Sequence, residues 1–125
     1  MSLTITNLTK GKLPRLPFVK MTDLVLGKEY DCSLVIISPS RSRALNRIHR
    51  GKDASTNILS FPLEKNAGEL FIDLERARAE CALFERSYRN FVGFLFIHGL
   101  FHLKGLDHSD TMEKQEKNVR RIFGI

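Results

Sequence analysis

Residues 90–105 read NFVGFLFIHGLFHLKG, and this stretch decides the fold because apolar side chains occupy almost every side of one helix. A helix that is apolar all round is buried on most of its faces. We therefore expect a central helix that begins at Asn90 and ends at Gly105, where glycine permits the positive φ of a sharp turn. Its apolar residues are Phe91, Val92, Phe94, Leu95, Phe96, Ile97, Leu100, Phe101 and Leu103.

Four further helices are predicted from apolar residues at helical spacing and from capping residues. Ser38 followed by Pro39 is typical of a helix start, and so is Asp73. Asp110 and Glu113 form an acidic capping box. The predicted helices run over Leu16–Leu26, Pro39 to about Ile48, Leu74 to about Ser87, and a C-terminal segment that carries Met112, Val119, Ile122 and Phe123.

Short apolar or alternating runs predict about four strands, most of them early in the chain. With 125 residues, of which 42% are hydrophobic and 27% charged, the chain has the size and composition of one globular domain. We expect a single α+β domain over residues 1–125, with a mixed sheet, about five helices, and a metal site on the buried helix and the turn after it. The strands are predicted around Leu3 and Ile5, at Ser33–Ser38, at Asn57–Phe61 and at Leu70–Ile72.

Neither a membrane anchor nor a secretion signal is expected. The longest mostly apolar run, Phe91–Leu103, has 13 residues and two histidines, which is too short and too polar to span a bilayer. Met1–Lys10 lacks the charged-then-apolar pattern of a signal peptide. The two cysteines, Cys32 and Cys81, are most simply reduced thiols. These features predict a cytoplasmic protein without a membrane partner.

The net charge of +6 is concentrated in the first half of the chain. Residues 1–52 carry ten Lys/Arg against three Asp/Glu, a net +7, whereas residues 53–125 carry ten against eleven, a net −1. Such a patch attracts polyanions by Coulomb steering and counterion release, although a solvated helix face is the alternative reading. The patch is densest in the acid-free window 41–52, which holds Arg41, Arg43, Arg47, Arg50 and Lys52.

Three histidines within eleven residues, His98, His102 and His108, predict a metal site. His98 and His102 are four residues apart on a helix, with Cα atoms about 6 Å apart, so both rings reach one ion at about 2.0–2.1 Å. His108 supplies a third ligand after the turn at Gly105. Three nitrogen ligands favour an open, catalytic site with an activated water. Asp107 is the nearest carboxylate for orienting a ligand or assisting proton transfer.

Other readings of the histidines remain open. The spacing also matches the ligand skeleton of metzincin proteases, but Gly99 stands where those enzymes carry their catalytic glutamate. Hydrolysis of a peptide or ester therefore ranks lower. A structural metal in a binding module would need a fourth protein ligand, most simply Cys32 or Cys81. Core histidines satisfied by backbone groups are the least specific alternative.

Three blocks of sequence resemble the YbeY-type endoribonuclease family of bacterial, metal-dependent rRNA maturation proteins. His98–His108 closely resembles its H-G-x-L-H-L-x-G-Y-D-H signature, with Phe101 and Leu106 as apolar exchanges. His49–Pro62 is similar to its Y-R-G-K-D-x-P-T-D/N-V-L-S-F-P segment, and Gly68-Glu69-Leu70 to its Gly-Asp-Ile strand entry. The blocks occur in order over roughly half of the chain.

The resemblance implies one zinc ion held by His98, His102 and His108. It implies that Arg50 is the family's functional arginine, and that the substrate is single-stranded RNA, chiefly rRNA precursors, with the ribosomal small subunit or its proteins as further partners and no DNA. Residue chemistry agrees, because a guanidinium is a bidentate donor to phosphate oxygens. Without the resemblance, a solvated loop charge is the simpler reading of Arg50. The roles of His49, Lys52, Ser60 and Phe61 stay open.

Overall fold

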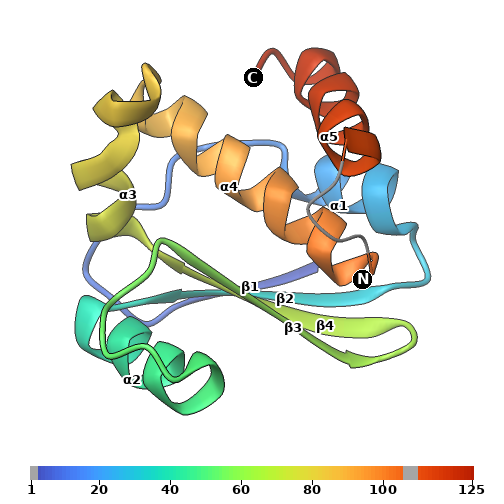
Figure 1. Cartoon of the computed structure of the whole chain (residues 1–125). Coiled ribbons are helices and arrows are strands. Elements are labelled where there is room, and N and C mark those ends of the chain that lie inside the picture. Colours follow the sequence, from blue (N-terminus) through green and yellow to red (C-terminus); the bar gives the residue numbers. More distant parts are fainter. Residues whose placement is uncertain (1–2, 106–109) are drawn as a thin grey trace.

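The computed structural model describes residues 3–105 and 110–125, and within them one four-stranded mixed sheet organises the fold (Figure 1). The strand order is β1-β2-β4-β3. β1 (Leu3–Asn7) and β4 (Ala67–Asp73) both run parallel to β2 (Asp31–Ile37), whereas β3 (Ile58–Glu64) pairs antiparallel with β4. β3 is therefore an edge strand of the sheet.

The helices cover the two faces of the sheet unequally, and α4 (Tyr88–Leu103) crosses one of them (Figure 1). α2 (Pro39–Arg50) lies on the opposite face. The α+β class and the mixed sheet are thereby confirmed. The other helices are α1 (Phe18–Leu26), α2 (Pro39–Arg50), α3 (Leu74–Glu80), the 3-10 helix η1 (Cys81–Phe84) and α5 (Asp110–Ile122).

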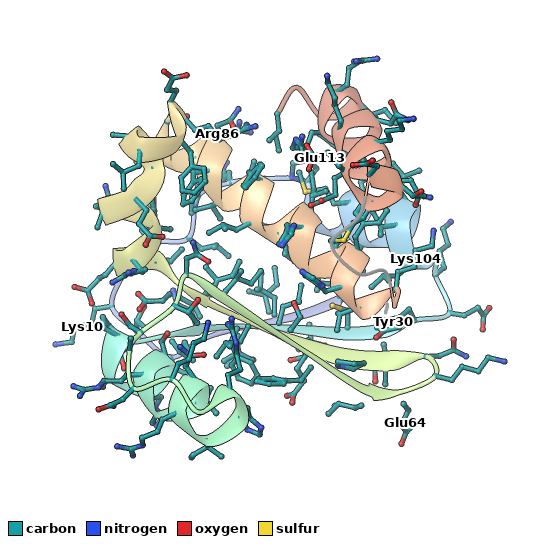
Figure 2. All side chains as sticks on the ribbon, in the orientation of Figure 1. Lys10, Tyr30, Glu64, Arg86, Lys104 and Glu113 are labelled. Atoms are coloured by element: carbon teal, nitrogen blue, oxygen red, sulfur yellow. The ribbon has the colours of Figure 1, made fainter. Side chains whose placement is uncertain are left out.

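The hydrophobic core lies between α4 and the sheet, where side chains fill the space between the two (Figure 2). Phe91, Phe96 and Ile97 of α4 are completely buried, as are Leu34 and Leu70 of the sheet. Burying each such side chain contributes about 1.5–3 kcal/mol. The helix that is apolar on almost every side is therefore buried on most of its faces, as expected, and only a few of its residues are exposed to solvent.

The predicted capping residues act as expected. The Ser38 hydroxyl accepts the backbone N–H of Arg41 at 3.3 Å, with Pro39 as the first helical residue. The Asp73 carboxylate accepts the N–H of Arg76 at 3.0 Å. Gly105 follows α4 with φ of 93°, which confirms the sharp turn that its position predicts. The start of α5, with the expected capping box, adjoins residues outside the described ranges.

The helix predicted from Leu74 to about Ser87 is wrong beyond Glu80. There the chain tightens into η1 and then turns at Glu85, which has a left-handed φ of 55°. The reason is that Ser87 is itself a cap, because its hydroxyl accepts the N–H of Asn90 at 3.1 Å. α4 consequently begins at Tyr88, and Asn90 lies in its first turn rather than at its start.

Two prolines also act differently from the prediction. Pro62 does not close the strand as expected, because β3 continues to Glu64, and a proline on an edge strand leaves no ladder hydrogen bond unmade. Conversely, Pro17 delays α1 to Phe18, because the residue before a proline is pushed out of the helical region.

Among the helices that the structure describes, none combines the length and the apolar character needed to cross a bilayer. Both cysteines are free thiols. Cys32 is buried in β2, and burial, followed by the charge of Asp31, raises the pKa of its thiol to about 12. The Cys81 thiol donates to the Arg78 carbonyl at 3.4 Å.

Candidate active site

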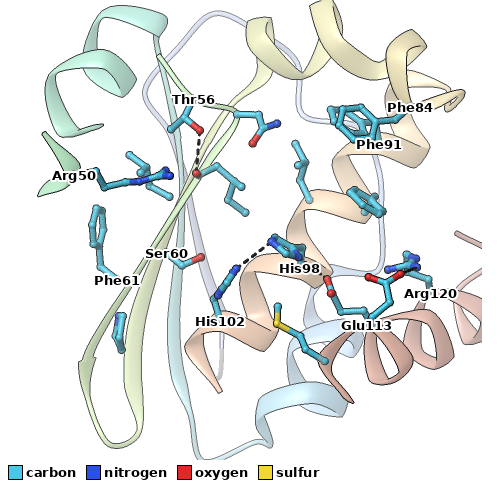
Figure 3. Close-up of a pocket in the computed structure, with 18 of the residues that line it drawn as sticks. Arg50, Thr56, Ser60, Phe61, Phe84, Phe91, His98, His102, Glu113 and Arg120 are labelled. Carbon is cyan, nitrogen blue, oxygen red and sulfur yellow. Dashed lines mark hydrogen bonds and ion pairs between the residues drawn. The ribbon is translucent and has the colours of Figure 1, made fainter. Parts of the chain in front are cut away.

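A cavity of about 710 Å³ extends along the edge strand β3 and is bounded by α4, α5 and the C-terminal end of α2 (Figure 3). One face of α4 supplies Phe91, Leu95, His98 and His102, which recur at the three- and four-residue spacing of a helix face. This arrangement brings two of the predicted metal ligands together with Arg50. The remaining lining comes from His49, residues 56–62, Phe84, Phe94, Met112, Glu113, Glu116 and Arg120.

The imidazoles of His98 and His102 converge on one point of the cavity (Figure 3). Their Nε2 atoms lie 3.0 Å apart, and the ring planes are perpendicular, with centroids 4.5 Å apart. This separation is short enough for both nitrogens to reach one ion at about 2.0–2.1 Å. The helical spacing of the two residues thus produces the convergence that the sequence predicts.

A carboxylate that the sequence reasoning missed orients His98. Glu116 of α5 is only 3% exposed, and its Oε1 atom lies 2.7 Å from His98 Nδ1. The carboxylate accepts the Nδ1 proton, so Nε2 is the ring nitrogen that faces His102 Nε2 in the cavity. Carboxylate–histidine pairs of this kind fix the orientation of metal-binding histidines. The donor set therefore fits a divalent metal.

A signal for Glu116 is present in the sequence. Glu116 follows Met112 by four residues and precedes Val119 by three, so it lies on the buried face of the last amphipathic helix. A carboxylate among apolar residues on a buried helix face needs a partner, because burying an unpaired charge is costly. Asp107, the carboxylate that is expected beside the histidines, lies outside the described residues.

Gly99 lies between the two histidines, at a point where α4 packs so closely on the sheet that little space remains for a side chain. A Cβ atom at this position would lie 2.7 Å from Ile58 Cδ1 and 2.9 Å from Leu70 Cδ2. The Ser60 hydroxyl donates a long hydrogen bond of 3.5 Å to the Gly99 carbonyl. A side chain at position 99, including the glutamate that metzincin proteases carry there, would have to displace Ile58 and Leu70.

Arg50 is the last residue of α2, and its side chain lines the same cavity (Figure 3). Buried polar residues of α2 hold the loop that follows it. The Ser42 hydroxyl both donates to the Thr56 carbonyl and accepts the Thr56 N–H, each at 2.8 Å. Asn46 Nδ2 donates to the Ala54 carbonyl at 2.8 Å. These bonds fix residues 54–56 against α2, the helix that ends at Arg50.

The basic window 41–52 is less uniformly positive than its sequence indicates. Arg43 forms a bidentate ion pair with Asp53, at 2.8 and 2.9 Å. The Arg43 guanidinium lowers the pKa of the Asp53 carboxyl, first through the hydrogen bond. The charge of Arg43 is therefore neutralised by Asp53, and Arg50 is the arginine of α2 that lines the cavity.

The undecided residues of the Arg50 segment separate into two groups. His49, Ser60 and Phe61 line the cavity, and the His49 and Phe61 rings pack with centroids 4.6 Å apart. The Phe61 ring also packs edge-on against the Phe71 ring, with centroids 5.6 Å apart. Phe61 therefore contributes to packing on the sheet as well as to the cavity lining. Lys52 is exposed and is not among the lining residues.

Two of the three predicted metal ligands, His98 and His102, lie among the described residues. Within residues 3–105 and 110–125, no three His, Cys, Asp or Glu side chains are grouped so as to hold a metal ion. His108, the expected third ligand, lies outside these ranges. Cys32 and Cys81, the expected fourth ligands of a structural metal, are both described, and neither lines the cavity.

Comparison with known proteins finds one family that matches most of the chain. The family model described as "Endoribonuclease YbeY" matches residues 16–122. Proteins named Endoribonuclease YbeY are 38% identical over 103 residues in Alkaliphilus metalliredigens and 35% identical over 112 residues in Alkaliphilus oremlandii. These matches cover 74% and 78% of this chain, but only 66% and 74% of the respective relatives.

A solved structure agrees with the fold. The solution structure of TM1509 from Thermotoga maritima superposes with a TM-score of 0.67 at 26% sequence identity. The superposition covers 97% of this chain and 90% of the other.

Proposed function

The chain belongs to the YbeY endoribonuclease family, and from this membership we propose that it is a zinc-dependent endoribonuclease that cleaves single-stranded RNA. The observation that carries the proposal is the convergence of the His98 and His102 Nε2 atoms, with Glu116 behind His98, in a cavity that also contains Arg50. Precursors of rRNA are the proposed substrates, in the cytoplasm, and the ribosomal small subunit or its proteins are the proposed partners.

We assign the metal to His98 and His102, with His108 as the third ligand expected from the sequence. A divalent metal bound there supplies a water of lowered pKa as the nucleophile. Glu116 accepts the His98 Nδ1 proton, so Nε2, the nitrogen that faces His102, is the one assigned to the metal. Three histidine ligands with no fourth protein ligand would leave room for a water, the composition usual in catalytic zinc sites.

Arg50 is proposed to bind the phosphate that is cleaved. Its guanidinium is always charged and presents several N–H donors in a plane, which suits two phosphate oxygens at once. As negative charge accumulates on those oxygens in the transition state, donors already in place stabilise it. The place of Arg50 supports this role, because it ends α2 and lines the cavity that contains His98 and His102.

The test is cleavage of a labelled single-stranded RNA oligomer by the purified full chain loaded with zinc. We expect His102→Ala and Arg50→Ala to lower the cleavage rate by at least about 100-fold, the scale for losing one preorganised charge-stabilising group. Arg121→Ala is the matched control, since Arg121 is an exposed arginine near a helix C-terminus that does not line the cavity.

Wild-type rates in both site variants would refute the mechanism. A fluorescent peptide screen with the same preparations addresses the alternative of peptide hydrolysis. We expect no peptide cleavage, because Gly99 stands where a metzincin protease carries its catalytic glutamate.

A further inference from the structure

A stack of phenylalanine rings lines the cavity on the side away from Arg50 (Figure 3). The Phe84 and Phe91 rings stack with centroids 4.9 Å apart and an interplanar angle of 26°. The Phe91 and Phe94 rings lie 5.9 Å apart at 12°. Phe91 is completely buried, whereas Phe84, the last residue of η1, is 50% exposed. One part of the Phe84 ring is thus packed on the stack, and the rest remains open.

Two guanidinium groups lie against the same stack. The Cζ atoms of Arg86 and Arg120 are 4.5 and 5.1 Å from the centre of the Phe94 ring. Arg86, near the N-terminal end of α4 (Figure 2), also donates to the Ile125 carbonyl at 3.1 Å. Burial, and then the like charge of Arg120, lowers the pKa of Arg86. Of the two, Arg120 lines the cavity, 3.8 Å from the Glu113 carboxylate, whereas Arg86 does not line it. An open aromatic face with an arginine beside it suits a flat, aromatic ligand that carries negative charge, which is the chemistry of a nucleotide.

The stack is aligned with the histidines along one helix face. Phe91, Leu95, His98 and His102 all line the cavity from α4. Phe91 precedes His98 by seven residues, which is about two turns or roughly 10 Å along the axis. In Figure 3, the two histidines lie between the stack and the group formed by Arg50 and Phe61. A strand bound at the histidines therefore has aromatic surfaces on both sides of it.

We propose that Phe84 is a stacking platform for one unpaired nucleobase next to the phosphate that is cleaved, an inference that rests on the proposed ribonuclease function. Bases in a duplex are stacked on their neighbours and paired, so only an unpaired base can rotate onto Phe84. The platform thus provides a physical reason for preferring single strands. Because every base has a π-face, it selects for strandedness rather than for sequence.

The experiment uses the absence of tryptophan from the chain. Phe84→Trp introduces a single tryptophan at the platform, and its fluorescence is quenched when a base stacks on it. We expect saturable quenching by a single-stranded RNA oligomer and wild-type affinity for this variant. Phe84→Leu keeps the apolar contact but loses the ring, so its affinity for the oligomer should fall about tenfold, within the range measured for single base–aromatic stacks.

Two controls make the result specific. Leu83→Ala removes an apolar neighbour that is 80% exposed and does not line the cavity, and it should bind as the wild type does. An abasic oligomer of equal length should bind the wild type and Phe84→Leu equally, since it offers charge without bases. Thermal unfolding of each variant verifies that it is folded.

The outcomes separate the two proposals. Wild-type affinity of Phe84→Leu, together with unquenched tryptophan fluorescence of Phe84→Trp, in proteins that still cleave the oligomer, would overturn the platform and leave the ribonuclease function intact. A wild-type chain that neither binds nor cleaves the oligomer would overturn both.

Discussion

At the scale of single residues, the contact between Glu116 and His98 determines which ring nitrogen faces the cavity. Replacing Glu116 with glutamine keeps the size of the side chain but removes the charge that holds the Nδ1 proton in place. We predict that Glu116→Gln lowers zinc affinity about 10- to 100-fold, the usual cost of losing such a partner. Competition with a chromogenic chelator measures this affinity directly.

Glu113→Gln is the control for that measurement, because Glu113 lies on the same helix with its side chain 70% exposed and pairs with Arg120 rather than with a histidine. Its zinc affinity should match that of the wild type. Equal losses in the two variants would mean that Glu116 acts only through the overall charge of α5.

The residue scale also shows what could be predicted from the sequence. His98 and His102 were predictable, since their four-residue spacing on a helix fixes their relation whatever the helix packs against. Glu116 lies 18 residues further along the chain, and its approach to His98 depends on how α5 docks on α4. Docking of this kind is a property of tertiary packing, which spacing along one helix does not encode.

At the scale of elements, the close packing of α4 on β3 and β4 positions the site. We predict that Gly99→Ala is less stable than Gly93→Ala by about 1–3 kcal/mol, the cost of overpacking a core. Both substitutions gain the same helix propensity, so their difference isolates packing. At Gly99 the added methyl would lie 2.7 and 2.9 Å from two side chains packed between α4 and the sheet, Ile58 and Leu70. At Gly93 it would lie 2.4 Å from the tip of one partly buried side chain, Ile125, which has more freedom to move aside.

Urea unfolding of the two glycine variants gives the comparison. A lower midpoint for Gly99→Ala with an unchanged slope is the predicted result, because such a change reflects stability alone. Equal midpoints and slopes would show that α4 can shift on the sheet without cost, and that packing does not require a glycine at position 99.

Element boundaries were predictable where a single residue type enforces them. Ser38 with Pro39, Asp73 and Gly105 each act locally, and each has the predicted role. The error at Ser87 has the opposite origin, because serine is tolerated inside a helix as well as at its cap. Which role it takes depends on the chain reversing after η1 so that α4 can cross the sheet.

At the scale of the whole molecule, the proposed metal site lies at the rim of a core that does not depend on it. The apolar residues of α4 and the sheet are buried against one another and form the core without either histidine. His98 and His102 are only partly buried. The excess positive charge of the first half of the chain is also partly located. Arg50 contributes a positive charge to the cavity, whereas Asp53 neutralises Arg43. Substitution of a histidine should therefore remove the metal and leave the fold intact.

The most direct measurement is the metal content of the full chain as purified, compared between the wild type and His102→Ala, with circular dichroism to verify that both are folded. We expect about one zinc ion per wild-type chain, the stoichiometry of a single histidine site, and almost none in the variant. A folded wild-type protein without bound metal, or a variant that retains as much metal as the wild type, would contradict the claim that the two converging histidines hold the ion.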